Sequence, residues 1–218
     1  MPLQNRVDPY GRLHAVAARG SLMGNRGILH DPEKRVVANW RLRRWIACVL
    51  AFRGRRREVF APRRYSELFF LDEATSLAAG HRPRAECRRE RYVEFRRAWA
   101  AGRGIAAGEP LPGADAMDRF LHEERVRRGG EKGTYEERLS ALPEGVLVEY
   151  RDRPHLKWGG RLLPWSFEGY GRPADAPEDE HARARVVVLT PRSIVGAIRA
   201  GFVPQVHESA SSPPRPRG

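Results

Sequence analysis

The side chains best suited to chemistry in this chain are two cysteines, Cys48 and Cys87, and a histidine, His81. Thiolates and imidazoles act as nucleophiles, and they are also the usual ligands of structural zinc, which takes four of them. Two cysteines allow at most one disulfide, and in a reducing compartment we expect them to be free, buried or bound to a metal. A zinc site here could close only by recruiting histidines such as His81 or His30.

The most specific local motif lies in the same region. An aromatic pair, Phe69-Phe70, precedes an Ala-rich stretch that ends at Ala79-Gly80, and His81-Arg82-Pro83 follows, with Cys87 four residues later. Over about residues 66–89 this order resembles the metal-binding domain of the Ada family of DNA-alkylation repair proteins. That family has an aromatic-rich strand, an Ala-rich helix, and an aromatic-Arg-Pro-Cys-x-x-Cys-Arg segment that supplies two zinc thiolates. The remainder of the chain resembles bacterial proteins from which no activity carries over.

The resemblance implies DNA contact and a metal site at Cys48 and Cys87, with His81 as a further ligand that such a site would have to recruit. Arg84 stands where the family has the first Cys of its closing pair, and Cys48 is the single cysteine in the region of the family's methyl-accepting upstream pair. The expected state is therefore a degenerate site without a cofactor, and bound zinc is the alternative. The resemblance also implies that the two thiols approach each other. We expect Arg84 to face solvent or to pair with an acid, for which the candidates are Glu67, Asp72 and Glu73.

Excess positive charge is confined to two windows. Residues 35–64 contain ten Arg and one acid, residues 82–97 contain seven Arg and three Glu, and together they account for the net charge of +13. The use of Arg rather than Lys also reflects GC-rich coding, but the clustering of the positive charge in two windows does not. A local field of this kind is typical of polyanion binding, with a solvated basic surface as the alternative. The residues expected to contact phosphates are Arg53, Arg55, Arg56, Arg57, Arg82, Arg84, Arg88 and Arg89.

Apolar patterns and turn signals predict the elements that position these residues. The N-terminal part reads as short strands between tight turns, and residues 45–52 and 57–60 read as two strands of a hairpin with most of the Arg cluster at its tip. A strand at 65–70 leads to a helix from Asp72 to Gly80, and a second helix covers about 85–101.

The second half is predicted to be rich in strands. A third helix is expected to be capped by Asp115, and strands are expected at 145–150, 155–158, 161–165 and 185–189. A final helix is expected between Thr190 and Gly201. Trp158, Trp165, Phe167 and Tyr170 could stack unpaired bases, although core packing is the commoner use of such rings.

These elements predict an α+β protein. We expect a basic Ada-like module at 1–101, a linker or long loop at 102–113, a helix plus strand-rich domain at 114–208 and a disordered tail at 209–218. No segment approaches the roughly 20 apolar residues of a membrane span, and the first residues lack the apolar core of a secretory signal, so a cytoplasmic location is expected.

The function predicted from the sequence is binding of nucleic acid, with DNA the expected form, and with weak sequence preference because phosphate contacts do not read bases. Two alternatives stay open. One is an enzyme of DNA repair or nucleic-acid processing that uses Cys48 and Cys87, which a close approach of the two thiols with a His would favour. The other is a basic module that binds a protein or RNA partner.

Overall fold

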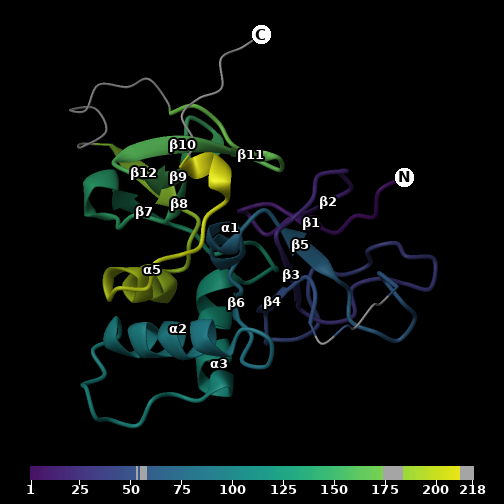
Figure 1. Cartoon of the computed structure of the whole chain (residues 1–218), viewed down its shortest axis with the longest axis horizontal. Helices are drawn as coiled ribbons and strands as arrows, with labels where there is room; N and C mark the ends of the chain where they lie inside the picture. The colour runs from purple at the N-terminus through teal and green to yellow at the C-terminus, as the bar shows by residue number, and fades with distance from the viewer. Residues whose placement is uncertain (53, 55–57, 174–183, 212–218) are drawn as a thin grey trace.

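The computed structural model describes residues 1–52, 54, 58–173 and 184–211, which form two six-stranded sheets and the helices packed against them (Figure 1). The combination of helices and strands confirms the α+β class. The Ada-like character of the N-terminal part stays a prediction.

The first sheet comes from the N-terminal part of the chain, in the order β2-β1-β5-β3-β4-β6. The β1–β5 and β4–β6 pairs are parallel, and the other pairs are antiparallel. Its strands are short, as the sequence predicted: β1 (Arg6–Val7), β2 (Leu13–His14), β3 (Leu22–Asn25), β4 (Ile46–Val49), β5 (Leu68–Phe70) and β6 (Arg82–Pro83).

The second sheet is antiparallel throughout, in the order β11-β10-β9-β8-β12-β7. Gly159 and Gly160 join β9 to β10 with φ values of 60° and 71°, the left-handed pair that a two-residue hairpin turn requires. This sheet confirms the strand-rich second half. Its strands are β7 (Tyr135–Arg138), β8 (Leu147–Tyr150), β9 (Arg153–Trp158), β10 (Arg161–Ser166), β11 (Gly169–Tyr170) and β12 (Arg185–Val188).

The described helices are α1 (Glu73–Ala78), α2 (Arg89–Ala101), α3 (Ala114–Arg125) and α5 (Arg192–Arg199), with single 3-10 turns η1 (Leu139–Ala141) and η2 (Glu208–Ala210). As predicted, Asp72 caps α1 by accepting the Thr75 N–H, and Gly80 follows the helix with a φ of 86°. The predicted cap Asp115 is instead in the first turn of α3, which begins after Gly113.

One hydrophobic core spans the predicted linker. Side chains of α2 such as Phe95 pack with Leu121 of α3, Val148 of β8 and Ile198 of α5. Helices α2 and α5 lie side by side (Figure 1) and approach so closely at Gly102 that an added Cβ there would lie 2.4 Å from the Gly196 backbone. Residues 102–113 form a largely exposed loop between α2 and α3, as predicted, but the elements on its two sides share one core, so α2 packs with the C-terminal half.

The helix α1 lies at the centre of the molecule (Figure 1), with all six of its side chains buried. Ala74 and Ala78 pack with Leu147 and Leu156 of the second sheet, and Ala79 packs with Leu68 and Phe70 of the first. The C-terminal end of α1 consequently sits where the two sheets meet, which is also where the candidate site forms.

Two sequence predictions need correction. Strand β4 is paired on both sides, antiparallel to β3 and parallel to β6, and residues 59–60 form a turn, so the predicted return strand at 57–60 is wrong over its described part. The local pattern identifies a strand but not its partner. The predicted tail also begins too early, because the Ser209 hydroxyl accepts the Tyr170 N–H at 2.8 Å. Residues 212–218 lie outside the described residues.

Candidate functional site

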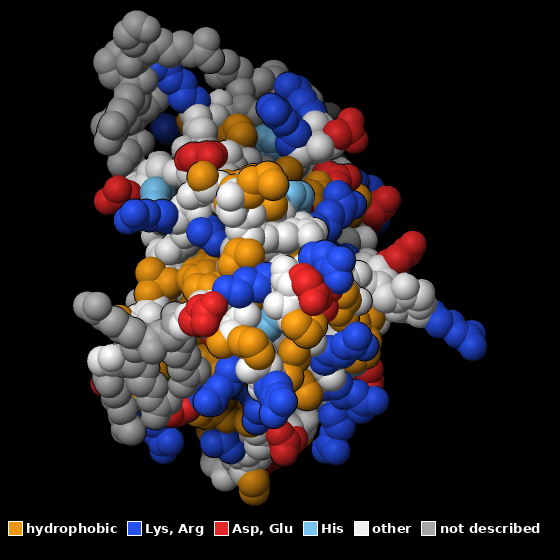
Figure 2. Space-filling view, turned by 90° about the vertical axis from the view of Figure 1, so that its right-hand side faces the viewer, with side chains coloured by type: hydrophobic (Ala, Val, Ile, Leu, Met, Phe, Trp, Pro, Cys, Tyr) orange, Lys and Arg blue, Asp and Glu red, His pale blue; other side chains and the backbone are white. Residues whose placement is uncertain are grey.

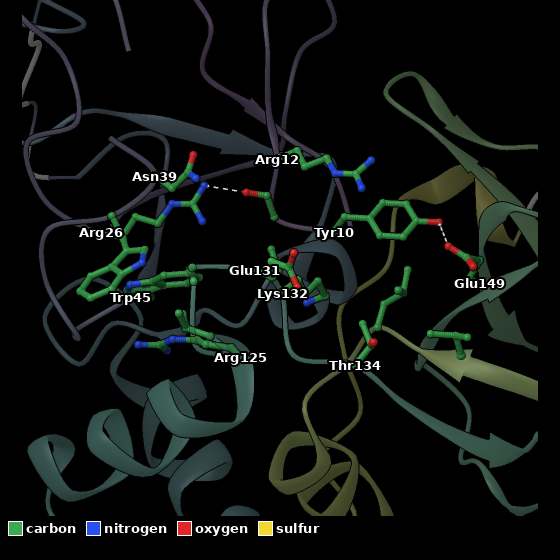
Figure 3. Close-up of a pocket in the computed structure, with 18 residues that line it drawn as sticks. Tyr10, Arg12, Arg26, Asn39, Trp45, Arg125, Glu131, Lys132, Thr134 and Glu149 are labelled. Carbon is green, nitrogen blue, oxygen red and sulfur yellow. Dashed lines mark hydrogen bonds between the residues drawn. The ribbon is translucent and has the colours of Figure 1, made fainter. Parts of the chain in front are cut away.

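A cavity of about 580 Å³ opens between the two sheets, at the C-terminal end of α1 (Figure 3). The first sheet and its loops contribute Tyr10, Arg26 and Trp45, and the second sheet contributes Glu149. Arg125 comes from the last turn of α3, and Lys132 comes from the segment that follows this helix. The other lining residues are Gly11, Arg12, Asn39, Trp40, Ala79, Val126, Gly129, Gly130, Glu131, Thr134, Val187 and Leu189.

Three cations converge on this cavity, and each is held by main-chain oxygen. Arg26 donates to the Gly11 carbonyl at 2.8 Å, Arg125 to the Gly80 carbonyl at 2.7 Å, and Lys132 to the Ala78 carbonyl at 2.5 Å. The last two acceptors belong to the C-terminal end of α1 and the residues just after it, where the helix dipole favours positive charge. Gly80 is required here because an added Cβ would lie 2.7 Å from the Arg125 side chain.

The indole of Trp45 holds two of the cations. The guanidinium carbons of Arg26 and Arg125 lie 4.7 Å and 4.2 Å from its ring centroid, above and below the indole in Figure 3. Cation–π contacts of this kind favour a desolvated guanidinium but leave its N–H groups free to bond elsewhere. The Nε atoms of Arg26 and Arg125 are buried and have no hydrogen-bond partner among the described residues.

Within the described part of the chain, no carboxylate forms an ion pair with Arg26, Arg125 or Lys132. The two acids whose charges act on these cations are engaged elsewhere: Asp8 accepts the Arg12 N–H at 2.9 Å and contacts His14, and Asp118 pairs with Arg82. Burial, reinforced by mutual repulsion, lowers the pKa of Lys132 to about 7, and burial lowers the pKa of Arg125 to about 9.

His81, a predicted metal ligand, belongs to this cationic region. Its ring is fully buried between Trp45 and Phe70, with centroid separations of 5.2 Å and 4.7 Å. Burial and the charges of Arg26, Arg125 and Lys132 hold its pKa well below the usual value, so the imidazole is neutral. Because the His81 ring carries no charge, it does not repel the three cations that surround it.

The mouth of the cavity is polar and partly aromatic. Arg12 is exposed, and its guanidinium carbon lies 4.9 Å from the Tyr10 ring centroid. The Tyr10 hydroxyl donates to Glu149 at 2.6 Å (Figure 3). Trp40 is partly exposed and meets His122 edge to face at 4.5 Å, so part of its indole remains accessible. Four cations, two acids and an accessible aromatic ring can together bind an anionic group attached to a planar ring.

The arginines that the sequence predicted to contact phosphates fall into buried and more exposed groups in the structure. Arg82 and Arg88 are buried, with 2% and 6% of their surfaces exposed, and they pair with Asp118 and Glu73. The expectation that these two contact phosphates is corrected, because their guanidinium groups are consumed by internal ion pairs. Arg89 is exposed at the start of α2, and Arg84 is half-buried and pairs with Glu86. Arg53, Arg55, Arg56 and Arg57 lie outside the described residues.

The two cysteines do approach each other, as the resemblance implied, since the Cys48 thiol donates a hydrogen bond to the Cys87 sulfur. His81 does not join them. Cys48 is in register with Met23, which is in register with Phe69, so these three share one face of the sheet. His81 contacts Phe70, the next residue along β5, on the opposite face.

The described residues therefore do not assemble the four-ligand set that zinc requires. No group of three or more His, Cys, Asp and Glu side chains within the described ranges has a metal-binding arrangement. The Nη1 atom of Arg84 lies 3.9 Å from the Cys48 sulfur, so a positive charge stands where a further ligand would be needed. Metal analysis of the purified protein tests whether zinc is bound.

Sequence reasoning missed Arg26, Arg125 and Lys132. One signal was present: Met117, Leu121 and Arg125 follow one another at four-residue spacing, so the arginine continues the buried stripe of α3. A charged residue on an apolar stripe requires a partner inside the protein. Arg26 and Lys132 lie in loops and carry no comparable signal.

The fold and the pocket thus define a mixed α+β protein with a cation-lined cavity between two sheets. No family model, curated protein or solved structure matches the chain. Among the helices in the described ranges, none has the length and apolar character to cross a bilayer.

Proposed function

We propose that the protein binds nucleic acid, with DNA the expected form, and that the cavity takes one backbone phosphate together with the adjacent unpaired base. The observation that carries the proposal is the convergence of Arg26, Arg125 and Lys132 on one cavity without an ion-pair partner among the described residues. The phosphate would lie against these cations, and the base would stack near Trp40.

The energetic argument concerns charge compensation. Removing a cation from water costs several kcal/mol unless a counter-charge or several hydrogen bonds replace the lost hydration. Here the carbonyl oxygens and the Trp45 ring leave the Nε–H groups of Arg26 and Arg125 without a hydrogen-bond acceptor among the described residues. A phosphate offers several acceptor oxygens and a negative charge, so it supplies what these groups lack.

The surroundings of the cavity favour a polymer over a small anion. Exposed arginines follow or precede the lining segments at Arg41, Arg43, Arg44, Arg127 and Arg128. On the side of the N-terminal sheet, Lys and Arg side chains are spread over the lower half of the surface, with a few acids among them (Figure 2). Such a surface attracts a chain of phosphates and raises association rates.

This mode of binding predicts a preference for single strands. A base can reach Trp40 only if it is unpaired, whereas phosphate contacts alone would not distinguish strands or sequences. The exposed Arg89, the half-buried Arg84 and the arginines at 53 and 55–57 would add backbone contacts outside the cavity.

The test uses a matched pair of lysines. Lys132→Met removes the pocket cation, while Lys157→Met removes another lysine that donates to carbonyls, those of Leu139 and Leu142, but does not line the cavity. We expect Lys132→Met to weaken binding of a fluorescein-labelled oligodeoxythymidylate about 10- to 100-fold, the size of one charge-assisted hydrogen bond, and Lys157→Met to leave it unchanged.

Fluorescence anisotropy measures both affinities, with circular dichroism confirming that each variant is folded. Equal affinities for the wild type and Lys132→Met would show that the cavity is not part of the binding site. Binding of duplex as tightly as single strand would leave the phosphate contacts but exclude the stacked base.

A further inference from the structure

The two cysteines lie at a second cavity, of about 310 Å³, on the opposite face of the first sheet from His81. Met23 and Phe69 line its apolar side, and Cys48, Cys87 and Arg84 line its polar side. Cys48 is buried in β4, and Cys87 is half-exposed two residues before α2. One thiol is thus covered while the other can meet a molecule that enters the cavity.

The hydrogen bonds of this pair assign different states to the two sulfurs. The Cys87 sulfur accepts from the Cys48 thiol and from the Val49 main-chain N–H, and it lies in the field of Arg84. The start of α2, a helix of 13 residues, adds a favourable dipole. These contacts lower the pKa of Cys87 to about 6, whereas the bond to Cys87 and burial raise the pKa of Cys48.

We propose that Cys48 and Cys87 form a redox-active dithiol that reacts with a peroxide and closes to an intramolecular disulfide. Cys87 is the attacking residue because its sulfur is accessible from the cavity and is stabilised as a thiolate. Cys48 is the resolving residue because it lies beside Cys87 on the wall of the same cavity.

The chemistry balances in two steps. The Cys87 thiolate attacks one peroxide oxygen, the O–O bond breaks, and the departing hydroxide or alkoxide takes a proton from the solvent to leave as water or alcohol, so that Cys87 becomes a sulfenic acid. The Cys48 sulfur then attacks the Cys87 sulfur. The S–S bond forms, the S–O bond breaks, and the departing hydroxide takes the Cys48 proton and leaves as water. Two thiols lose two electrons in total, and the peroxide gains them.

Arg84 has a positioning part in this scheme. Its Nη1 donates toward the Cys48 sulfur at 3.9 Å and its Nη2 pairs with Glu86, so the guanidinium is fixed beside both sulfurs. A fixed positive charge stabilises the thiolate before attack and the departing hydroxide afterwards. The proposal does not rest on nucleic-acid binding, because the cavities lie on different faces of the sheet.

The experiment treats the reduced full-length protein, freed of reductant, with one equivalent of hydrogen peroxide. We expect the intact mass to fall by about 2 Da, both thiols to become unreactive toward a thiol reagent, and dithiothreitol to restore both. Cys48→Ser should stop at a sulfenic acid that dimedone traps, and Cys87→Ser should react with peroxide at least about tenfold more slowly than the wild type.

The wild-type result does not depend on how the variants fold. Arg84→Met serves as the positioning control, and we expect a slower first step, an alkylation midpoint displaced to higher pH, and the same final disulfide. A wild-type protein that keeps two free thiols, or that forms only disulfides between chains, would overturn the proposal. So would thiols that are protected by copurified zinc and become reactive only after chelation.

Discussion

At the scale of single residues, Lys132 is the pocket cation whose charge varies near neutral pH. Burial, together with the charges of Arg26 and Arg125, lowers its pKa to about 7. A bound phosphate stabilises the protonated form and therefore raises that pKa. Above pH 7, binding must be accompanied by proton uptake, so the anion affinity depends on pH in a direction that the structure fixes.

We expect the affinity for an oligodeoxythymidylate without terminal phosphates to fall as the pH is raised above about 7, by at most about tenfold per pH unit. Calorimetry at pH 8 in buffers of different ionisation enthalpy should detect the proton uptake directly. In Lys132→Met the pH dependence should be absent, while Lys157→Met should retain it. A wild-type affinity that is constant between pH 6 and pH 8.5 would show that the charge of Lys132 does not contribute to binding.

At the scale of elements, local signals identified α1 and its boundaries but not the neighbours of the strands. Asp72 and Gly80 act within a few residues of the helix, so the sequence alone contains their effect. The pairing of β4 with β3 and β6 depends on segments far away along the chain, as does the meeting of Arg26 with Lys132. The cationic pocket therefore could not be predicted from spacing, whereas the approach of the two cysteines followed from the family resemblance.

The ion pair between Arg82 of β6 and Asp118 of α3 ties the first sheet to the helices, with bonds of 2.9 Å and 2.7 Å. Both side chains are almost completely buried. Arg82→Met would leave the Asp118 charge without its partner, so we expect a loss of about 3 to 5 kcal/mol in the free energy of unfolding. Urea denaturation measures this. Arg89→Met, an exposed neighbour in sequence, should change stability little.

The Arg82→Met variant also tests whether this arginine stabilises the fold or contacts DNA. Per folded molecule, Arg82→Met should bind oligodeoxythymidylate as the wild type does, since its guanidinium faces Asp118. If Arg82→Met were as stable as the wild type but bound the oligonucleotide weakly, Arg82 would contact DNA in solution and would not stabilise the fold through the buried ion pair.

At the scale of the whole molecule, positive charge is present in two forms. Arg26 and Arg125 are buried and Lys132 is partly buried around one cavity, whereas the arginine surplus at 35–64 includes exposed side chains such as Arg41, Arg43 and Arg44. Buried and exposed cations respond differently to salt, because exposed charges act through released counterions and buried ones through direct bonds. Affinity measured against salt concentration can therefore separate them.

Replacing Arg53, Arg55, Arg56 and Arg57 together by Ala should weaken binding of duplex and single-stranded DNA alike. If all four contact phosphates, the slope of log affinity against log salt should become shallower by up to about 3 to 4 units on duplex. Lys132→Met should instead change that slope by about one unit at most and should act mainly on single strands, because the pocket is proposed to take an unpaired base. An unchanged slope in the folded quadruple variant would show that these four arginines do not contact phosphates, and the cavity would then be the remaining proposed binding site.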